Sequence, residues 1–440
     1  MLLGCIGDDF TGSTDLAGFL VASGMRTIQL TGLPKEKFDL SDVDAVVISL
    51  KSRTQETEAA VADSLSALKW LQSYDCKQYY FKYCSTFDST ERGNIGPVTD
   101  ALLDALGESF TIACPSLPVN GRAVYNGYLF VNGVLLNESG MQHHPLTPMK
   151  DANLVRVLGR QARGKVGFVN QATVSMGAEA IRKRYAKLAE SHRYAIVDTL
   201  FSKDLIEIGH AGDERRLLTG GSGLAIGLAD NFEKKGLFAK EPNAARLDRV
   251  EGEALILSGS CSSATLEQVA VFKAEHPAFK LDPLALHKGS QTFDQVMQWF
   301  EAHRHQSPLM VYATDHPEEI RRCQEKLGIE HAGTLIEQMF AKIARTAATL
   351  GVTQFIVAGG ETSGAVVQAL GIKAIKIGPP IAPGVPVKQR ISRPKTIISL
   401  MHKATHRKIL RYRSELLSKR VIQNNLGSCF GNLLSGNAIH

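Results

Sequence analysis

The fold is decided near the start of the chain, in the stretch Leu2-Leu3-Gly4-Cys5-Ile6-Gly7-Asp8-Asp9-Phe10-Thr11-Gly12-Ser13-Thr14-Asp15. Its apolar beginning, 2–6, is typical of a buried strand, and the amphipathic residues 16–22 that follow are typical of a helix. The residues between them predict a tight loop, with Ser13 or Thr14 capping the helix. In an open α/β sheet such a loop lies at the carboxyl end of a strand, where ligands bind.

Asp8 and Asp9 are the chemically distinctive residues of this loop. Two adjacent carboxylates can hold a cation, accept hydrogen bonds from a polyol, or take a proton from a hydroxyl. The alternative is that they only cap the helix and stabilise its positive end. We take both as candidate catalytic residues.

Strand and helix patterns alternate along the first half of the chain, which favours a parallel sheet with helices on both faces. One segment departs from this alternation: 125–130 and 134–136 flank Asn132-Gly133, a strong hairpin signal. The predicted strands are 27–30, 45–50, 79–83, 110–113, 166–169 and 194–197, and the predicted helices are 56–71, 95–106, 178–191 and 203–208.

A polar stretch without periodicity, 233–249, contains Pro242 and separates this half from a second alternation. We therefore expect an α/β protein made of two doubly wound, mostly parallel sheet domains with an active cleft between them. The first domain is placed at 1–235 and the second at 250–386. The second alternation predicts strands at 254–257, 309–312, 354–357 and 374–377, and helices at 264–273, 293–303, 334–350 and 363–370.

Two loops of the second half occupy a strand-to-helix position. Paired glycines let backbone amides converge on an anion, and the helix start adds positive potential. Two such loops in one domain suggest a nucleotide held between them, whereas ordinary capping at tight turns is the alternative. The residues concerned are Ser258, Gly259 and Ser260 in one loop, and Gly360, Glu361, Thr362 and Ser363 in the other.

A third glycine-rich run, Thr219-Gly220-Gly221-Ser222-Gly223, nearly spells the dinucleotide motif G-x-G-x-x-G. Ile226 stands at the third glycine position, and no clear strand precedes the run. The dinucleotide interpretation, and with it an NAD-dependent oxidoreductase, is therefore weak.

Charged residues also follow two further predicted strands, at the sheet edge where we place Asp8 and Asp9. Lys82, Asp88, Arg92 and Asn94 follow one of these strands, and Arg122 follows the other. Arginine can grip a carboxylate through two parallel hydrogen bonds, whereas Asp and Asn suit hydroxyl groups. The alternative is a plain salt bridge between Arg92 and Asp88.

The amino-acid composition limits which classes of protein this chain can belong to. With 44% apolar and 21% charged residues, the chain is typical of a globular protein, and no apolar run approaches the ~20 residues of a membrane span. Seven cysteines without a C-x-x-C pair argue against zinc and disulfide frameworks and favour a reducing, cytoplasmic setting. The net charge of +6 arises in one segment: residues 387–440 carry eleven Lys or Arg and one Glu. The rest is mildly acidic, so we expect neither a nucleic-acid nor a membrane partner.

Taken in order, these motifs resemble those of the four-carbon acid sugar kinase family, from residue 1 to about 386. The matching stretches are 6–15, 88–96, 114–128, 219–225, 258–260 and 359–364. The resemblance implies a sugar-acid domain followed by a nucleotide domain, and ATP-dependent phosphorylation of the terminal hydroxyl of a four-carbon sugar acid. It also implies that 258–260 and 360–363 contact ATP, with Mg²⁺ bridging the phosphates.

The same resemblance implies that Asp8, Asp9, Asp88 and Arg92 line the sugar-acid site. We assign the substrate carboxylate to Arg92, together with Arg122, and assign Asp9 to orienting or deprotonating the attacking hydroxyl. Lys82 and Asn94 complete the predicted set of substrate-binding residues. The closest activity within the family is that on a 3-oxo-tetronate; threonate or erythronate is the alternative acid. The sequence leaves a homo-oligomer open.

The chain departs from the family pattern after Pro386. The family continues through an apolar strand into a Lys-Ser-Gly-Asn-Phe-Gly segment, whereas this chain becomes basic and lacks that segment. An abrupt change at a fixed point is typical of a shifted reading frame or a replaced terminus. From it we expect a poorly ordered tail over 387–440, with a strand at 396–401 and a helix at 407–419 as the remaining structured candidates. A catalytically impaired sugar-acid-binding homologue is therefore a further alternative.

Overall fold

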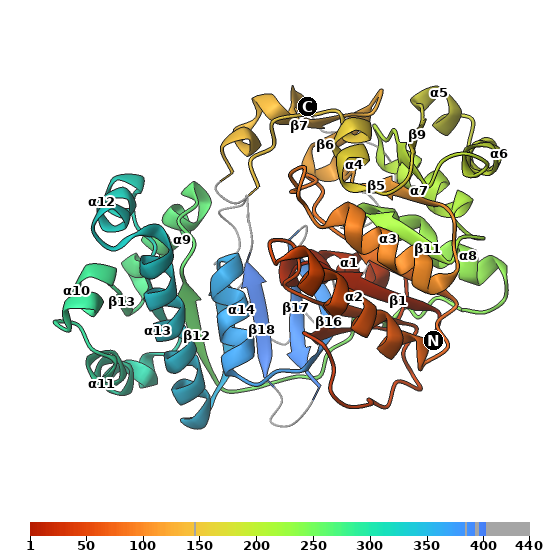
Figure 1. Ribbon diagram of the computed structural model, residues 1–440. Helices are drawn as coiled ribbons and strands as arrows, with labels where there is room; N and C mark the ends of the chain where they lie inside the picture. Colours follow the sequence, from red (N-terminus) through yellow and green to blue (C-terminus); the bar gives the residue numbers. More distant parts are fainter. Residues whose placement is uncertain (145–146, 383–384, 392–395, 402–440) are drawn as a thin grey trace. The chain divides into compact units, whose positions relative to one another are not determined.

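The computed structural model describes residues 1–144, 147–382, 385–391 and 396–401. By their contacts they divide into two compact units, drawn in Figure 1. Unit 1 comprises 1–251 together with 367–380 and 386–399, and unit 2 is built mainly on 252–366. The last strands of the chain, which we expected in the second domain, thus belong to unit 1. Within the described part of the chain, no helix has the length and apolar character needed to cross a membrane.

Unit 1 contains a long mixed sheet whose strands run in the order β18-β17-β16-β2-β3-β1-β4-β11-β5-β10-β9. From β2 to β9 all neighbours are parallel, whereas β16 joins β2 antiparallel and β17 joins β18 antiparallel. The strands are β1 (Leu3–Gly7), β2 (Thr27–Thr31), β3 (Ala45–Ser49), β4 (Gln78–Lys82), β5 (Thr111–Cys114), β9 (Val166–Val169), β10 (Tyr194–Val197), β11 (Leu217–Gly220), β16 (Ala374–Ala382), β17 (Val385–Arg390) and β18 (Ile397–Met401).

The helices of unit 1 form two groups. Helices α2 and α3 pack together, whereas α1 and α7 both pack on the 3₁₀ segment η4. Right-handed crossovers put such groups on opposite faces of a parallel sheet, as the ribbon shows (Figure 1). The helices are α1 (Phe10–Ala22), α2 (Thr57–Gln72), α3 (Ile95–Leu106), α4 (Leu154–Gln161), α5 (Gln171–Val174), α6 (Ala178–Ala189), α7 (Ser202–Ala211) and α8 (Leu228–Lys234), with η1 (Pro118–Asn120), η2 (Leu136–Glu138), η3 (Gly140–His143) and η4 (Ser222–Gly227).

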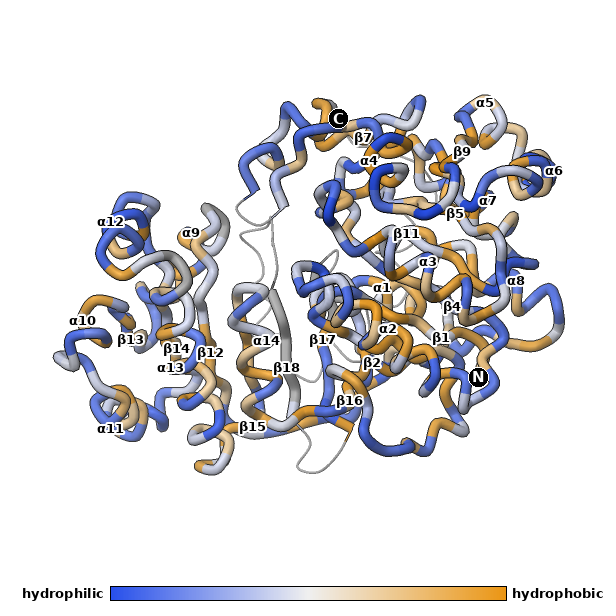
Figure 2. Tube along the Cα trace, viewed as in Figure 1, coloured by the Kyte–Doolittle hydropathy of each residue, from blue (hydrophilic) through white to orange (hydrophobic). Residues whose placement is uncertain are grey.

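Strand β1 is the topological switch point of this sheet. All five of its residues are buried. The chain leaves β1 toward β2 in one direction, and later passes from β3 to β4 in the other. The central strands are orange in Figure 2, in keeping with their buried side chains. Ligands of doubly wound folds bind outside the carboxyl ends of the strands at such a point, which is where the loop holding Asp8 lies.

A small antiparallel sheet, β6 (Arg122–Tyr125), β7 (Tyr128–Val131) and β8 (Val134–Leu135), interrupts the alternation. The hairpin predicted at Asn132-Gly133 is confirmed, but the strand predicted over 125–130 is wrong. It breaks at Asn126-Gly127, where both residues have positive φ values of 50° and 75°. An Asn-Gly pair favours such a turn, and it forms one here as well as at Asn132-Gly133.

Unit 2 holds a parallel sheet in the order β13-β14-β12-β15. The predicted strand and helix positions of this half are confirmed, with β13, α10 and α12 added. The elements are β12 (Glu253–Ser258), α9 (Ser263–Glu275), β13 (Ala278–Lys280), α10 (Pro283–Lys288), α11 (Phe293–His303), η5 (Arg304–Gln306), β14 (Leu309–Tyr312), α12 (Pro317–Leu327), α13 (Ile329–Thr349), β15 (Val352–Ala358) and α14 (Gly360–Ala369), whose last residues count with unit 1.

The atypical C-terminal segment is described only in part. Residues 385–390 form β17 and the strand predicted at 396–401 is confirmed as β18. The helix predicted at 407–419 and the rest of the tail lie outside the described residues.

Candidate functional site

The loop after β1 presents Asp8 and Asp9 at the carboxyl edge of the sheet. Asp9 is the N-cap of α1, because its Oδ1 accepts a hydrogen bond from the Gly12 amide at 3.1 Å. The expectation that Ser13 or Thr14 caps the helix is therefore wrong. Both lie inside the helix and donate to carbonyl oxygens one turn earlier, with the Ser13 hydroxyl 2.6 Å from the Asp9 oxygen.

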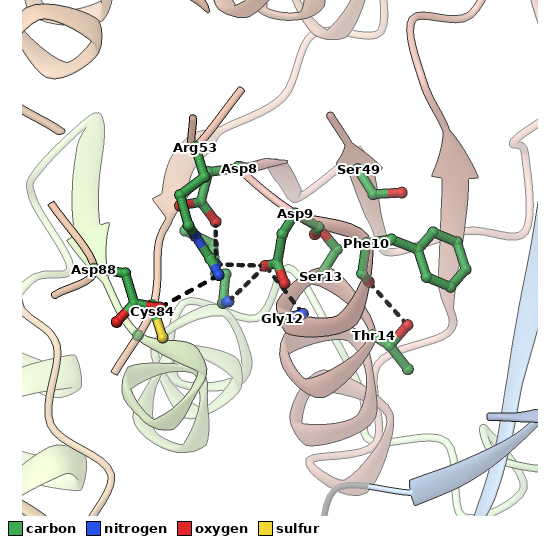
Figure 3. Close-up of polar contacts among 12 residues, drawn as sticks. Asp8, Asp9, Phe10, Gly12, Ser13, Thr14, Ser49, Arg53, Cys84 and Asp88 are labelled. Carbon is green, nitrogen blue, oxygen red and sulfur yellow. Dashed lines mark hydrogen bonds and ion pairs between the residues drawn. The ribbon is translucent and has the colours of Figure 1, made fainter. Parts of the chain in front are cut away.

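Arg53 lies at the centre of the site, and the sequence analysis missed it. Its guanidinium forks onto Asp8 through Nε and Nη2, each 2.8 Å from a carboxylate oxygen. The same Nη2 lies 2.8 Å from Asp9 Oδ1, and Nη1 lies 3.6 Å from Asp88 Oδ2. Figure 3 shows Arg53 between Asp8 and Asp9 on one side and Asp88 on the other. One cation thus joins three carboxylates from two separate loops.

Arg53 belongs to a loop that follows β3, and that loop is fixed by its backbone. The amides of Ser52 and Arg53 both donate to the Asp8 carbonyl oxygen, at 3.0 and 3.2 Å. The Asn94 side chain donates to the carbonyl oxygens of Ser52 and Gln55 at 2.8 Å each. Asn94, a predicted substrate ligand, is buried in these contacts, so it holds the Arg53 loop in place.

Lys82 is the second cation of the cluster. It ends β4, its side chain is buried, and its Nζ lies 3.3 Å from Asp9 Oδ1. The ammonium rests against the first turn of α1: a Cβ added to Gly12 would lie 1.4 Å from Lys82 Nζ. Gly12 therefore creates the space in which Lys82 meets Asp9.

These contacts push the two carboxyl groups in opposite directions. Burial and the neighbouring Asp9 raise the pKa of Asp8, in spite of the Arg53 fork. Burial acts on Asp9 in the same sense, but the charges of Lys82 and Arg53 outweigh it and hold the pKa of Asp9 below its usual value. Asp9 is thus an ionised carboxylate between two cations, which is a weak proton acceptor and a good anchor for hydrogen bonds.

Asp88 and Arg92 follow β4 in the same loop but have different surroundings. Asp88 is buried and accepts a hydrogen bond from the Thr86 hydroxyl at 2.5 Å. It pairs with Arg53, so the salt bridge to Arg92 that we considered does not form. Arg92 is exposed, and its backbone amide donates to the Thr90 hydroxyl at 3.3 Å. Within the described residues, the Arg92 guanidinium makes no contact with Asp8, Asp9 or Asp88.

Arg122 begins β6 in the small sheet. It donates from Nη1 to the Asn120 carbonyl oxygen, and its buried Nε has no partner in the described part of the chain. A hollow of about 400 Å³ beside this sheet is lined by Pro118, Gly121, Ala123, Tyr125, Phe130, Gly133 and Leu200. The structure does not bring Arg122 into contact with the aspartates.

Asp8, Arg53 and Asp88 leave almost no free space between them, whereas the Asp9 side chain is 28% exposed. The cavity beside these three side chains measures about 10 Å³, roughly the room for one water molecule. The Ser52 hydroxyl beside it has no hydrogen-bond partner among the described residues. The wall is formed by Asp8, Ser52, Arg53, Phe81, Asp88, Ser89, Asn94 and Ile95.

In unit 2 the two predicted nucleotide loops lie side by side. The amides of Gly259 and Ser260 donate to the Ala358 carbonyl oxygen at 2.9 and 3.0 Å. A Cβ on Gly259 would lie 2.2 Å from the Thr362 hydroxyl, so the loops meet at a residue without a side chain. Gly359 has a φ of 121°, which an L-residue with a side chain rarely adopts.

The hydroxyl groups of these loops are largely used within the unit. Ser258 is buried and shares a 2.7 Å hydrogen bond with the Thr314 hydroxyl. The Ser363 hydroxyl donates to the Gly359 carbonyl oxygen at 2.6 Å, whereas Gly360 and Glu361 at the start of α14 are exposed. The loops therefore offer a ligand backbone amides and the exposed helix start more than serine hydroxyls.

The third glycine-rich run has a packing role. Contrary to expectation a strand, β11, does precede it, and the run continues into η4. A Cβ on Gly220 would lie 2.3 Å from the Cys114 carbonyl oxygen, and one on Gly221 would lie 2.4 Å from that of Pro115. These glycines allow two neighbouring backbones to approach closely.

Comparison with known proteins agrees with this arrangement. A sugar-binding N-terminal domain matches residues 3–228, and a nucleotide-binding C-terminal domain matches residues 255–404. The chain is 54% identical to a 3-oxo-tetronate kinase of Burkholderia multivorans, over 89% of this chain and 91% of the relative. It is 47% identical to a 3-oxo-tetronate kinase of Haemophilus influenzae, over 88% of this chain and 92% of the relative.

Two solved structures share the fold. A protein of Salmonella typhimurium LT2 superposes with a TM-score of 0.85 at 41% identity, covering 94% of this chain and 99% of that one. The Haemophilus influenzae protein HI1011 superposes with a TM-score of 0.79 at 44% identity, covering 94% and 100%. With both domain models matched in order and relatives at this identity over most of its length, the chain belongs to the four-carbon acid sugar kinase family.

Proposed function

We propose that this chain is an ATP-dependent kinase that phosphorylates the terminal, 4-hydroxyl group of 3-oxo-tetronate to give 3-oxo-tetronate 4-phosphate. Relatives with that name share up to 54% of aligned residues over about nine-tenths of the chain. The observation that carries the proposal is the charged cluster of Asp8, Asp9, Asp88, Arg53 and Lys82 at the switch point of unit 1. Such a cluster fits a polyol, and it lies within the matched sugar-binding domain.

The charges of this site indicate which part of the substrate each residue binds. Three carboxylates and two cations leave the ionised cluster with a net negative charge, which disfavours a second anion among the aspartates. We therefore assign the hydroxyl end of the acid to Asp9 and Asp88, and its carboxylate to the arginines outside the cluster, Arg92 and Arg122. Phosphoryl transfer depends mainly on positioning and charge neutralisation. Asp9 orients the attacking hydroxyl, and Lys82 with Arg53 supplies positive charge beside it.

The nucleotide is assigned to the two loops of unit 2. Backbone amides near Gly359 and the exposed start of α14 suit the phosphates of ATP. Mg²⁺ usually binds through one or two carboxylates together with substrate phosphates. No group of three or more His, Cys, Asp or Glu is arranged to hold a metal ion in the described ranges. Glu361 is the exposed carboxylate that this loop offers.

We also propose a cytoplasmic location. All six cysteines of the described residues are free thiols, four of them buried, with Cys84 partly exposed and Cys261 exposed. Free thiols persist in a reducing compartment.

The proposal is tested by coupled ADP release over a panel of four-carbon sugar acids: 3-oxo-tetronates, threonates and erythronates of both hands. We expect 3-oxo-tetronate to give the highest kcat/KM. In parallel, Arg92→Lys keeps the charge but loses the planar fork. It should raise the KM for the acid about tenfold or more while the KM for ATP changes little, since bidentate pairs are the strong ones. ADP release with none of these acids would overturn the proposed activity, and equal effects on both KM values would make Arg92 structural.

A further inference from the structure

Unit 2 carries a charged pair that no part of the proposed function uses. Because β13, β14, β12 and β15 are parallel, the loops after them share one edge of the sheet. Two of these loops hold the predicted phosphate contacts. The loop after β14 holds Asp315, and β13 ends at Lys280. The Lys280 Nζ lies 2.6 Å from Asp315 Oδ2.

Asp315 is tied to the loop of Ser258. The Thr314 hydroxyl donates to the Ser260 carbonyl oxygen at 2.7 Å, so it accepts its 2.7 Å hydrogen bond from the Ser258 hydroxyl. The Ala313 amide donates to the Ser258 carbonyl oxygen at 2.8 Å. The strand order places β12 between β14 and β15, so Asp315 lies on the far side of the Ser258 loop from Gly359.

The Asp315 carboxylate is held in place yet remains accessible. Its Oδ1 accepts from the His316 amide at 3.0 Å, its Oδ2 faces Lys280, and its side chain is 25% exposed. Burial alone would raise the pKa of Asp315, but Lys280 and the backbone amide outweigh it and lower that pKa. Each oxygen keeps one lone pair for a further donor.

We propose that Asp315, oriented by Lys280, accepts hydrogen bonds from the ribose hydroxyls of the nucleotide. This rests on the proposed function, since the phosphates are assigned to the Gly359 loop. An ionised carboxylate can only accept hydrogen bonds and offers a phosphate no donor, so its place one loop away suits the neutral, hydroxyl-bearing part of ATP. A carboxylate that receives a ribose hydroxyl is the solution that other nucleotide-binding α/β sheets use. Lys280 already neutralises the charge, which argues against a metal ion there.

Calorimetry of the full chain with ATP and with 2′-deoxy-ATP and 3′-deoxy-ATP tests this, without a sugar acid. A hydrogen bond to a charged group lost from the ribose should cost the wild type about tenfold or more in affinity for at least one deoxy nucleotide. Asp315→Asn should weaken ATP by a similar factor and should bind ATP and that deoxy nucleotide almost equally. Asp294→Asn, at an exposed aspartate in the first turn of α11, is the matched control and should keep the wild-type ratio.

An unchanged ratio of ATP to deoxy-ATP affinity in Asp315→Asn overturns the inference. So does a variant whose defect is repaired by raising the Mg²⁺ concentration, because that would mark Asp315 as a group on the metal side. Lys280→Met guards against a folding defect at Asp315: it should weaken ATP binding less than Asp315→Asn and leave the deoxy ratio intermediate. Because binding is measured without turnover, these results stand apart from whether the sugar acid is phosphorylated.

Discussion

Gly12 is a position in unit 1 that has no room for a side chain. Gly12 lies where the Lys82 ammonium meets α1, and a methyl group there would overlap it at 1.4 Å. The ammonium cannot move far, because its stem is buried at the end of β4. We therefore expect Gly12→Ala to push Lys82 away from Asp9 while the helix, which favours alanine, still forms.

Gly12→Ala should lower kcat by ~10², the effect of about 1 Å of misplacement at a reacting centre. In a Lys82→Met background it should add little, because the group it displaces is already absent. The control is Gly140→Ala, where an added Cβ meets nothing within 4 Å. If the two substitutions instead add independently, Gly12 does not act through Lys82.

At the same scale, sequence reasoning found the carboxylates and missed their partner. Asp8 and Asp9 stand out because they are adjacent and follow a strand. Arg53 lies between Ser52 and Thr54 in a loop without a glycine, and only its position just past the carboxyl end of β3 marks it. Asn94 was predicted to bind substrate, but its side-chain amide donates hydrogen bonds to the backbone of the Arg53 loop. Side-chain partners of this kind depend on contacts between residues more than thirty positions apart, which local patterns do not encode.

At the scale of elements, the two loops of unit 2 depend on one another. Gly259 passes the Thr362 hydroxyl so closely that a methyl group would lie 2.2 Å from it. Gly259→Ala should therefore separate the Ser258 loop from the start of α14. We expect ATP affinity, measured by calorimetry, to fall about tenfold or more while circular dichroism stays unchanged, since phosphate sites require close backbone approach.

The comparison for this loop is Gly333→Ala in α13, where an added Cβ has open space. It should leave ATP affinity intact. Normal affinity in a folded Gly259→Ala chain would mean that the nucleotide does not use the junction of these loops.

Elements with a strong period were predicted well because hydrophobic burial follows the repeat of the strand or helix. The buried strands and long helices of both halves lie where expected. Boundaries and turns were less certain: α1 begins at Phe10 since Asp9 takes the cap, and Asn126-Gly127 splits one expected strand. The membership of β16 in unit 1 rests on its pairing with β2, over three hundred residues away, and β17 follows beyond β16; no local pattern indicates that pairing.

At the scale of the whole molecule, the basic C-terminal segment introduces a lysine into the core. Lys388 on β17 is buried, its Nζ has no hydrogen-bond partner in the described part of the chain, and it lies 5.2 Å from the centre of the Phe10 ring. Burial lowers the pKa of Lys388 well below the ordinary lysine value of 10.5, although Asp15 opposes this. A buried amine without a hydrogen-bond partner costs stability.

Lys388→Met keeps the length of the side chain and removes the amine, so it should raise the free energy of unfolding by ~1–3 kcal/mol at neutral pH. The wild type should also become more stable as pH rises toward 10.5, because the unfolded chain there binds a proton that folded Lys388 does not. The variant should lose that rise. Denaturant titrations across pH measure both effects.

Lys373→Met provides the reference, since Lys373 pairs with Glu36 at 2.9 Å with both side chains mostly exposed. It should change stability by no more than ~0.5 kcal/mol. A Lys388→Met chain that is no more stable than the wild type would show that the buried amine has a compensating partner.

The small space beside Asp8 and Asp88 also affects the rate of ligand binding. A space of about 10 Å³ admits one water molecule but no sugar. A ligand can reach the buried carboxylates of Asp8 and Asp88 only when Arg53 releases one of them. Capture is then an encounter followed by a slower exchange of ion pairs, so the observed binding rate should level off at high ligand concentration instead of rising without limit.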